Sequence, residues 1–176
     1  MKWKNCNEED GADRKSVPFL SVRGEKMTVK QMWEAFLRVT PEAAGEEVEA
    51  WHYGGEHADQ LAALTYLGVK TATSSAYPMY EVTGESLPCS GAYSVVMNTN
   101  GEAVCVVYTS RVYVVPFCDV SEEHAWREGE GDRSLAYWRR VHREFFSTCM
   151  EKENLAFSED TGVVCEEFTR VFPTLS

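Results

Sequence analysis

Apolar residues recur at intervals of three and four in three stretches of the chain, the spacing that gives a helix one buried side. The first stretch begins at Thr28, which with Gln31 has the spacing of a capping box. The second ends at Gly68, a residue suited to the position after a helix. The third follows Asp132, whose carboxylate can act as its N-cap. In the order of the three stretches, the apolar positions are Met32, Trp33, Phe36 and Leu37; Ala58, Leu61, Ala62, Leu64 and Leu67; and Leu135, Trp138, Val141, Phe145 and Cys149.

The pattern then changes from helical spacing to runs typical of strands. Residues 91–117 hold three runs rich in Val and Tyr, and residues 98–101 have the composition of a hairpin turn. A short helix is predicted after Ser121, and residues 162–173 form a closing strand. Because helices and strands do not alternate strictly, we predict an α+β fold, with a small, mostly antiparallel β-barrel flanked by helices.

Residues 1–27 are polar and aperiodic, which predicts a loosely held N-terminal arm. Residues 28–176 are then predicted to form a single domain, including the N-terminal helices. A chain of 176 residues buries roughly 70% of its unfolded surface, enough for a core without disulfides or metal. No window has the roughly 18 uncharged apolar residues of a membrane span, and the first residues lack the apolar core of a signal peptide. We therefore expect no membrane partner and a cytoplasmic location; the pattern predicts no oligomeric state.

The charge balance restricts the partners further. The chain has 17 Lys and Arg against 28 Asp and Glu, a formal net charge of −11. Non-specific affinity for DNA or RNA comes almost wholly from cationic side chains that neutralise phosphates. We therefore expect long nucleic acids to bind weakly, whereas one nucleoside or one base held in a pocket remains compatible with the charge.

A dense cluster of polar side chains occupies residues 68–81. Its members are Lys70, Thr71, Thr73, Ser74, Ser75 and Tyr77. An extended strand would put Lys70 and Thr73 on opposite faces, whereas a turn brings positions three apart together. Cooperation between these two residues therefore requires a turned loop. The alternative is that Lys70 compensates the carbonyl end of the preceding helix while the hydroxyls form local turn bonds.

A second cluster, Glu128, Glu130 and Asp132, alternates with glycines, which let backbone and carboxylates approach a ligand or a metal closely. Capping of the following helix explains Asp132 but not the two glutamates. The spacing does not fit a calcium loop, and the cysteines form no CxxC pair. His124 and Glu128 alone are a weak zinc signal, so we expect no metal and no cofactor.

The residues Gly68, Lys70 and Thr73 match a Gly-x-Lys-x-x-Thr motif, and the chain resembles the ASCH domain family of the PUA-like superfamily. Residues 115–146 are similar to the uncharacterised bacterial branch of that family, which carries an extended helical region. The likeness covers roughly residues 50 to 173. It implies a PUA-like β-barrel whose cleft is formed by the motif loop and the Glu-Gly-Glu-Gly-Asp segment.

The resemblance also implies a ligand, a nucleoside, nucleotide or RNA base bound in that cleft. Aromatic stacking would come from Tyr77, Tyr80 or Trp51. The full set of expected ligand contacts is Gly68, Ser75, Tyr77, Tyr80, Glu130, Asp132 and Trp51. A smaller relative has an Arg at the position of Ser75, so the substrate of this chain differs in at least one contact.

The same resemblance implies an alternative, a small amidohydrolase that deacylates a modified nucleoside such as N4-acetylcytidine. Its Lys, Thr and Glu correspond to Lys70, Thr73 and Glu128, the last after a His-Ala pair. A lysine whose pKa is near about 10.4 activates a hydroxyl only if burial or a nearby cation lowers that pKa. If ionised Glu128 lies beside Lys70, the lysine instead stabilises an oxyanion and Glu128 carries the proton. Both assignments stay open at the level of sequence.

Overall fold

The computed structural model describes residues 26–174, so the predicted N-terminal arm lies almost entirely outside the described residues. The chain divides into two compact units. Of the described residues, unit 1 contains 26–68, Ala92–Tyr108 and 169–174, and unit 2 contains Val69–Gly91 and Thr109–Phe168. The prediction of a single domain from residue 28 onward stays a prediction.

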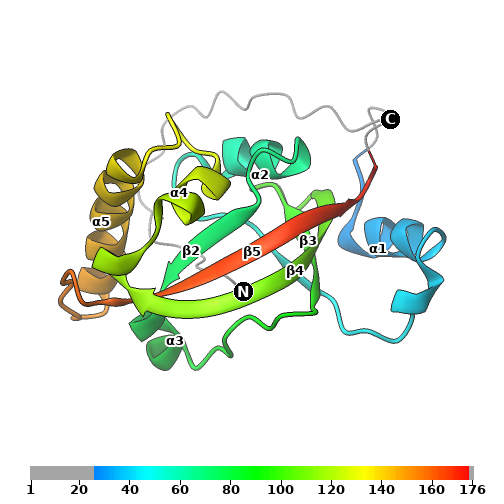
Figure 1. The fold of residues 1–176 in the computed structure, drawn as a ribbon. Coiled ribbons are helices and arrows are strands. Elements are labelled where there is room, and N and C mark those ends of the chain that lie inside the picture. The colour runs from blue at the N-terminus through cyan, green and yellow to red at the C-terminus, as the bar shows by residue number, and fades with distance from the viewer. Residues whose placement is uncertain (1–25, 175–176) are drawn as a thin grey trace. The chain divides into compact units, whose positions relative to one another are not determined.

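The secondary structure is mixed, and Figure 1 shows its elements. In chain order they are α1 (Val29–Leu37), the 3-10 helix η1 (Pro41–Ala43), β1 (Glu49–Trp51), α2 (Ala58–Tyr66), β2 (Ala72–Ala76), α3 (Tyr77–Thr83), β3 (Tyr93–Met97), β4 (Ala103–Pro116), η2 (Phe117–Asp119), α4 (Glu122–Glu128), α5 (Leu135–Lys152) and β5 (Gly162–Phe172). The strands pair in the order β1, β3, β4, β5, β2. The β1–β3 pair is parallel, whereas β3–β4 and β2–β5 are antiparallel. The predicted α+β class with a mostly antiparallel sheet is confirmed.

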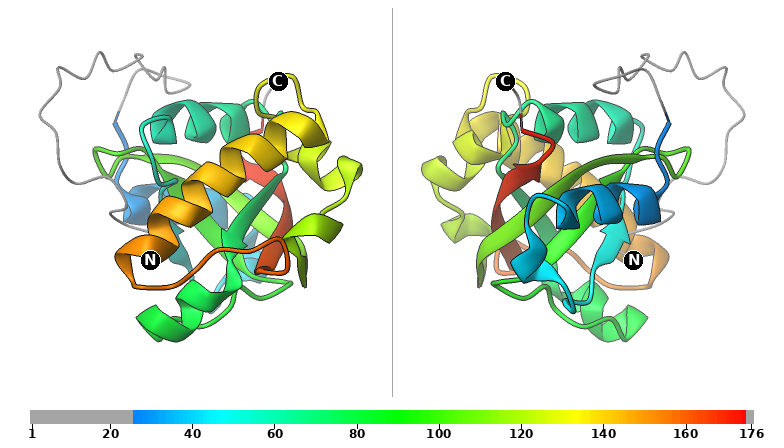
Figure 2. Two further views of the ribbon diagram at one scale, coloured as in Figure 1. Left: turned by 90° about the vertical axis from the view of Figure 1, so that its left-hand side faces the viewer. Right: turned by 90° about the vertical axis from the view of Figure 1, so that its right-hand side faces the viewer.

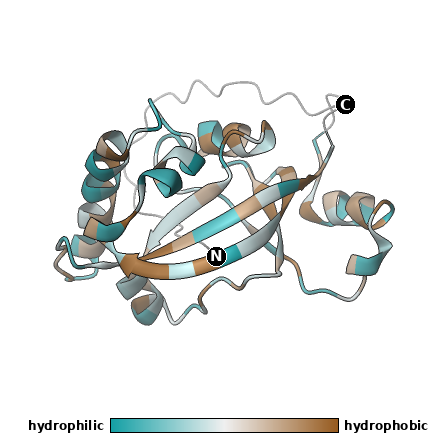
Figure 3. Cartoon of the chain, in the orientation of Figure 1, coloured by the Kyte–Doolittle hydropathy of each residue, from teal (hydrophilic) through white to brown (hydrophobic). Residues whose placement is uncertain are grey.

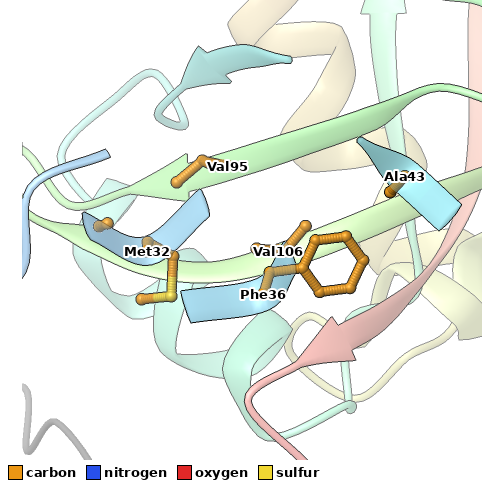
Figure 4. Packing of buried hydrophobic residues seen from close by; sticks show 6 residues of the cluster. Met32, Phe36, Ala43, Val95 and Val106 are labelled. Carbon is orange, nitrogen blue, oxygen red and sulfur yellow. The ribbon is translucent and has the colours of Figure 1, made fainter. Parts of the chain in front are cut away.

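The core of unit 1 forms where α1 packs on β3 and β4. Thr28 and Gln31 make the predicted capping box, which fixes the start of the helix. Met32 and Phe36 then face Val95 and Val106, as Figure 4 shows. The Phe36 ring also lies 5.3 Å from that of Tyr93 and 6.1 Å from that of Phe172. Unit 1 is therefore organised around one aromatic side chain of α1.

Three predicted elements differ from the structure. The second and third strand-like runs form one strand, β4, because residues 103–115 contain no Gly or Pro to interrupt the ladder. Strand β1 was not predicted from the sequence. Helix α3 was not predicted, although Pro78 in its first turn is the position where a helix accepts proline.

Unit 2 contains α4 and α5 side by side (Figures 1 and 2). Ser121 and Ser134 cap the two helices with their hydroxyl oxygens. The expected N-cap of α5, Asp132, is therefore wrong by two positions; its Oδ1 accepts a hydrogen bond from the backbone N–H of Ser134 instead. Hydrophilic and hydrophobic segments alternate along α5 in Figure 3, as expected for a helix with one buried side. None of the helices in residues 26–174 is long and apolar enough to span a membrane.

Truncation of the aromatic centre of unit 1 should destabilise the protein strongly. We expect Phe36→Ala to cost about 3–5 kcal/mol of unfolding free energy, because the side chain is 1% exposed and its neighbours would relax only partly into the cavity. Urea unfolding followed by circular dichroism measures this loss. Val39→Ala is the control, since Val39 is 66% exposed and its truncation should change stability by at most about 0.5 kcal/mol. Equal effects of the two variants would contradict the assigned core.

Candidate functional site

The segment that carries Lys70 is extended, not turned. Residues Ala72–Ala76 form β2, which pairs with β5, and the backbone carbonyl of Thr71 accepts a hydrogen bond from the N–H of Phe168. The turned loop required for Lys70 and Thr73 to cooperate is therefore absent from this segment. In an extended chain, alternate residues share a face, so Ser74 lies on the side of Lys70. Thr73 instead lies opposite Glu166 on the neighbouring strand.

Lys70 is a buried cation with two carboxylate partners. Its side chain is 1% exposed, and Nζ lies 2.6 Å from Oε2 of Glu128 and 2.7 Å from Oε1 of Glu130. A lone buried ammonium is costly, and charge-assisted hydrogen bonds to two carboxylates offset that cost. These contacts join residues 58 and 60 positions apart in the chain. They favour the charged form of Lys70, so the lysine is poorly suited to act as a general base.

Glu128 is the centre of the cluster. Its side chain is 1% exposed, like that of Lys70. While Oε2 contacts the ammonium, Oε1 accepts hydrogen bonds from Ser74 Oγ at 2.6 Å and from the Trp138 indole N–H at 2.7 Å. The carboxylate therefore connects β2, α4 and α5, and it has a charged or polar partner on both oxygens.

The charge state of this carboxylate follows from its neighbours. Burial alone raises the pKa of Glu128, but the Lys70 ammonium and hydrogen bonding outweigh burial and hold the pKa well below its ordinary value. Burial lowers the pKa of His142. The negative charges of Glu128 and Glu130 raise that pKa, but they offset only part of the lowering. His142 is therefore neutral near pH 7, and we attribute the low pKa of Glu128 chiefly to Lys70.

A chain of hydrogen bonds leads from the carboxylate to a tyrosine. Ser74 Oγ lies 2.9 Å from Nε2 of His124, and Nδ1 of the same ring lies 3.2 Å from the hydroxyl of Tyr113. Nε2 is also 3.4 Å from Oε1 of Glu128. Burial raises the pKa of Tyr113 to about 12, so the phenol stays protonated at neutral pH. The chain of contacts is therefore Tyr113, His124, Ser74 and Glu128.

Two glycines hold the acidic loop against this cluster. Gly129 ends α4 in the left-handed conformation, and a Cβ added there would lie 2.6 Å from the carbonyl oxygen of Val69. A Cβ at Gly131 would lie 2.4 Å from the Tyr137 ring. The glycines thus permit the close approach that brings Glu130 to Lys70.

The remaining residues predicted for the site are dispersed. Ser75 and Tyr80 are buried and share a 2.8 Å hydrogen bond, so their hydroxyls contact each other. Asp132 is exposed and contacts the start of α5. Tyr77 is partly buried beside Gly162, while Gly68 ends α2 with φ of 72°. Trp51 belongs to unit 1, where it is 3% exposed and its ring lies edge-on to Tyr53 at 5.0 Å.

Four members of the cluster were not assigned to the site from the sequence: Ser74, His124, Trp138 and His142. The signals were present but weak. Ser74 has the period-two relation to Lys70, and His124 precedes Glu128 by one helical turn. His142 stacks on Trp138 with centroids 4.3 Å apart, one turn along α5. Within residues 26–174, no group of three or more His, Cys, Asp and Glu side chains is arranged to hold a metal ion.

The close approach of Gly129 to Val69 predicts an unusual cost for a small substitution. Gly129 and Gly84 each end a seven-residue helix, with φ of 74° and 67°. Gly84→Ala should cost about 1–2 kcal/mol, the penalty of the left-handed backbone alone, because nothing lies within 4 Å of its Cβ. Gly129→Ala should cost about 1–3 kcal/mol more, since the added methyl meets backbone. Thermal unfolding measures both; equal shifts would contradict the packing of the loop.

The buried ion pair predicts a specific dependence of stability on pH. Because the pKa of Glu128 is depressed in the folded state, its contribution is present above the unfolded value of about 4.3 and is lost as the pH falls towards the folded value. Glu128→Gln should therefore flatten the fall in stability below about pH 4.3 and cost about 3–5 kcal/mol at pH 7. Urea unfolding between pH 7 and pH 3 tests both effects. Exposed Glu144→Gln is the control; the same pH slope in wild type and Glu128→Gln would refute the assignment.

Comparisons with known proteins identify the fold family. The family model described as ASCH domain matches residues 49–172. The crystal structure of an ASCH domain from Lactobacillus crispatus JV V101 is similar to this chain with a TM-score of 0.74 and 32% identity, over 86% of this chain and 99% of that one. A protein from Enterococcus faecalis V583 matches with a TM-score of 0.73 and 30% identity, over 81% and 87% of the two chains. The comparison with curated proteins gave no match. The chain therefore belongs to the ASCH domain family.

Proposed function

We propose that unit 2 binds a small nucleoside-like ligand or a single RNA base at the Lys70 cluster, with Glu130 as the main contact. The observation that carries this proposal is the buried Lys70–Glu128 ion pair, which fixes the position of the partly exposed Glu130 carboxylate. A buried ion pair contributes little net stability compared with apolar side chains of similar volume, and here it holds the Lys70 ammonium between two carboxylates. Such rigidity is useful where a ligand must be held in one orientation.

The charge of the cluster favours an uncharged ligand. Lys70 carries one positive charge and the two glutamates carry two negative charges, so the sum is −1 while His142 is neutral. A carboxylate accepts hydrogen bonds from amino and hydroxyl groups but repels phosphate. A nucleoside or an unpaired base thus fits better than a nucleotide, and the net charge of −11 disfavours long RNA.

A binding experiment tests this proposal. Isothermal titration calorimetry with cytidine, adenosine, guanosine and uridine should show saturable binding of at least one nucleoside, about tenfold or more tighter than its 5′-monophosphate. Glu130→Gln should weaken that binding about tenfold, because it removes the accessible negative charge. Glu144→Gln, which removes an exposed charge on α5, should leave it unchanged. No binding by any of the four nucleosides, or binding unaffected by Glu130→Gln, would overturn the proposal.

A second candidate function is the deacylation of a modified nucleoside such as N4-acetylcytidine. The 2.6 Å contact of Lys70 with Glu128 supports it, because these residues correspond to two of the three residues, Lys, Thr and Glu, that the resemblance assigns to the amidohydrolase. The low pKa of Glu128 favours binding over catalysis, since an efficient proton shuttle needs a pKa near the working pH. Because β2 is extended, Thr73 also lies on the opposite face of this segment from Lys70. Incubation with N4-acetylcytidine and chromatography of released cytidine distinguishes the two functions.

A further inference from the structure

The hydroxyl of Ser74 has an environment that no other hydroxyl near Lys70 shares. Its Oγ lies 2.6 Å from Oε1 of Glu128 and 2.9 Å from Nε2 of His124. By contrast, the Thr71 hydroxyl donates to the backbone carbonyl of Arg127, and that of Ser75 contacts the Tyr80 phenol. Ser74 is partly exposed, whereas His124 and Glu128 are each 1% exposed. A reagent thus reaches the serine more easily than the two groups that bracket it.

We propose that Ser74 is a nucleophile, with His124 as its general base, for acyl transfer from small neutral carboxylic esters or amides. This reaction goes beyond nucleoside binding and does not require it. A serine becomes nucleophilic when an adjacent base within hydrogen-bond reach removes its proton, and His124 Nε2 meets that distance.

The two neighbours of the hydroxyl compete for its proton, and their charges decide between them. Transfer to Glu128 is unfavourable because Lys70 stabilises the ionised carboxylate. Transfer to His124 creates an imidazolium 3.4 Å from that same carboxylate, an attraction that favours the product. This transfer requires the His124 tautomer whose Nε2 is free, in which the Nδ1–H group donates to the Tyr113 oxygen 3.2 Å away.

The reaction balances without a further reactant except water. Ser74 Oγ forms a bond to the acyl carbon while its proton passes to His124, and one electron pair of the carbonyl double bond moves to the carbonyl oxygen. The C–N or C–O bond then breaks, and the imidazolium returns the proton to the leaving amine or alcohol. Water, deprotonated by His124, hydrolyses the acyl-serine to a carboxylic acid and the free hydroxyl.

An alkyl fluorophosphonate tests the inference directly, since it reacts with activated serines by forming a P–O bond and releasing fluoride. Intact-mass spectrometry of the wild-type protein should show one adduct, and fragmentation should locate it at Ser74. His124→Gln should slow labelling about 100-fold or more, the scale of general-base catalysis. Ser110→Ala, which removes an exposed serine hydroxyl on β4, is the control and should leave the rate unchanged.

The possible results separate this inference from the nucleoside proposal. The inference is wrong if no adduct forms, if the adduct lies on another residue, or if His124→Gln does not change the labelling rate. The mapping uses the wild-type protein, so it does not depend on the folding of any variant. Saturable nucleoside binding without labelling would leave the binding function intact and refute Ser74 alone.

Discussion

The cost of burying one ammonium group is the constraint on which unit 2 depends. Lys70 reaches into the interior, where an unpaired charge is prohibitively expensive, so two carboxylates must approach it. One of them, Glu128, is itself buried and needs partners for its second oxygen, which Ser74 and the Trp138 indole supply. These contacts bring β2, α4, the acidic loop and α5 together around Lys70. The packing around the site thus supplies each buried charged group with an opposite charge or a hydrogen-bond partner.

This arrangement also explains why Lys70 and Glu128 are better suited to act as fixed charges than to transfer protons. A lysine between two carboxylates keeps its proton, and a glutamate beside an ammonium loses its own. Neither group exchanges protons easily near pH 7, so both act as fixed charges. His124, which contacts both the Ser74 hydroxyl and Oε1 of Glu128, is the group proposed above to accept a proton. Fixed charges suit orientation and electrostatic stabilisation, while proton transfer falls to His124.

The glycines of the acidic loop couple backbone geometry to these charges. With a side chain at residue 129, the loop would collide with the carbonyl of Val69, and Glu130 would move away from Lys70. The close approach therefore depends on the absence of a Cβ rather than on an attractive contact. In unit 1 the dependence is different, because Phe36 and its apolar neighbours stabilise the packing by burial alone.

The sequence by itself determined the helices α1, α2 and α5 and the closing strand β5, because hydrophobic period, caps and terminating residues are local signals. It also singled out Lys70, which lies among hydroxyl residues, and Glu128 and Glu130, which alternate with glycines. Only the tertiary structure decided which hydroxyl faces the lysine. That choice depends on the pairing of β2 with β5, which extends the segment and turns Ser74, not Thr73, towards Glu128. Strand pairing is a long-range interaction between residues about 90 positions apart, and no local pattern in the Lys70 segment encodes it.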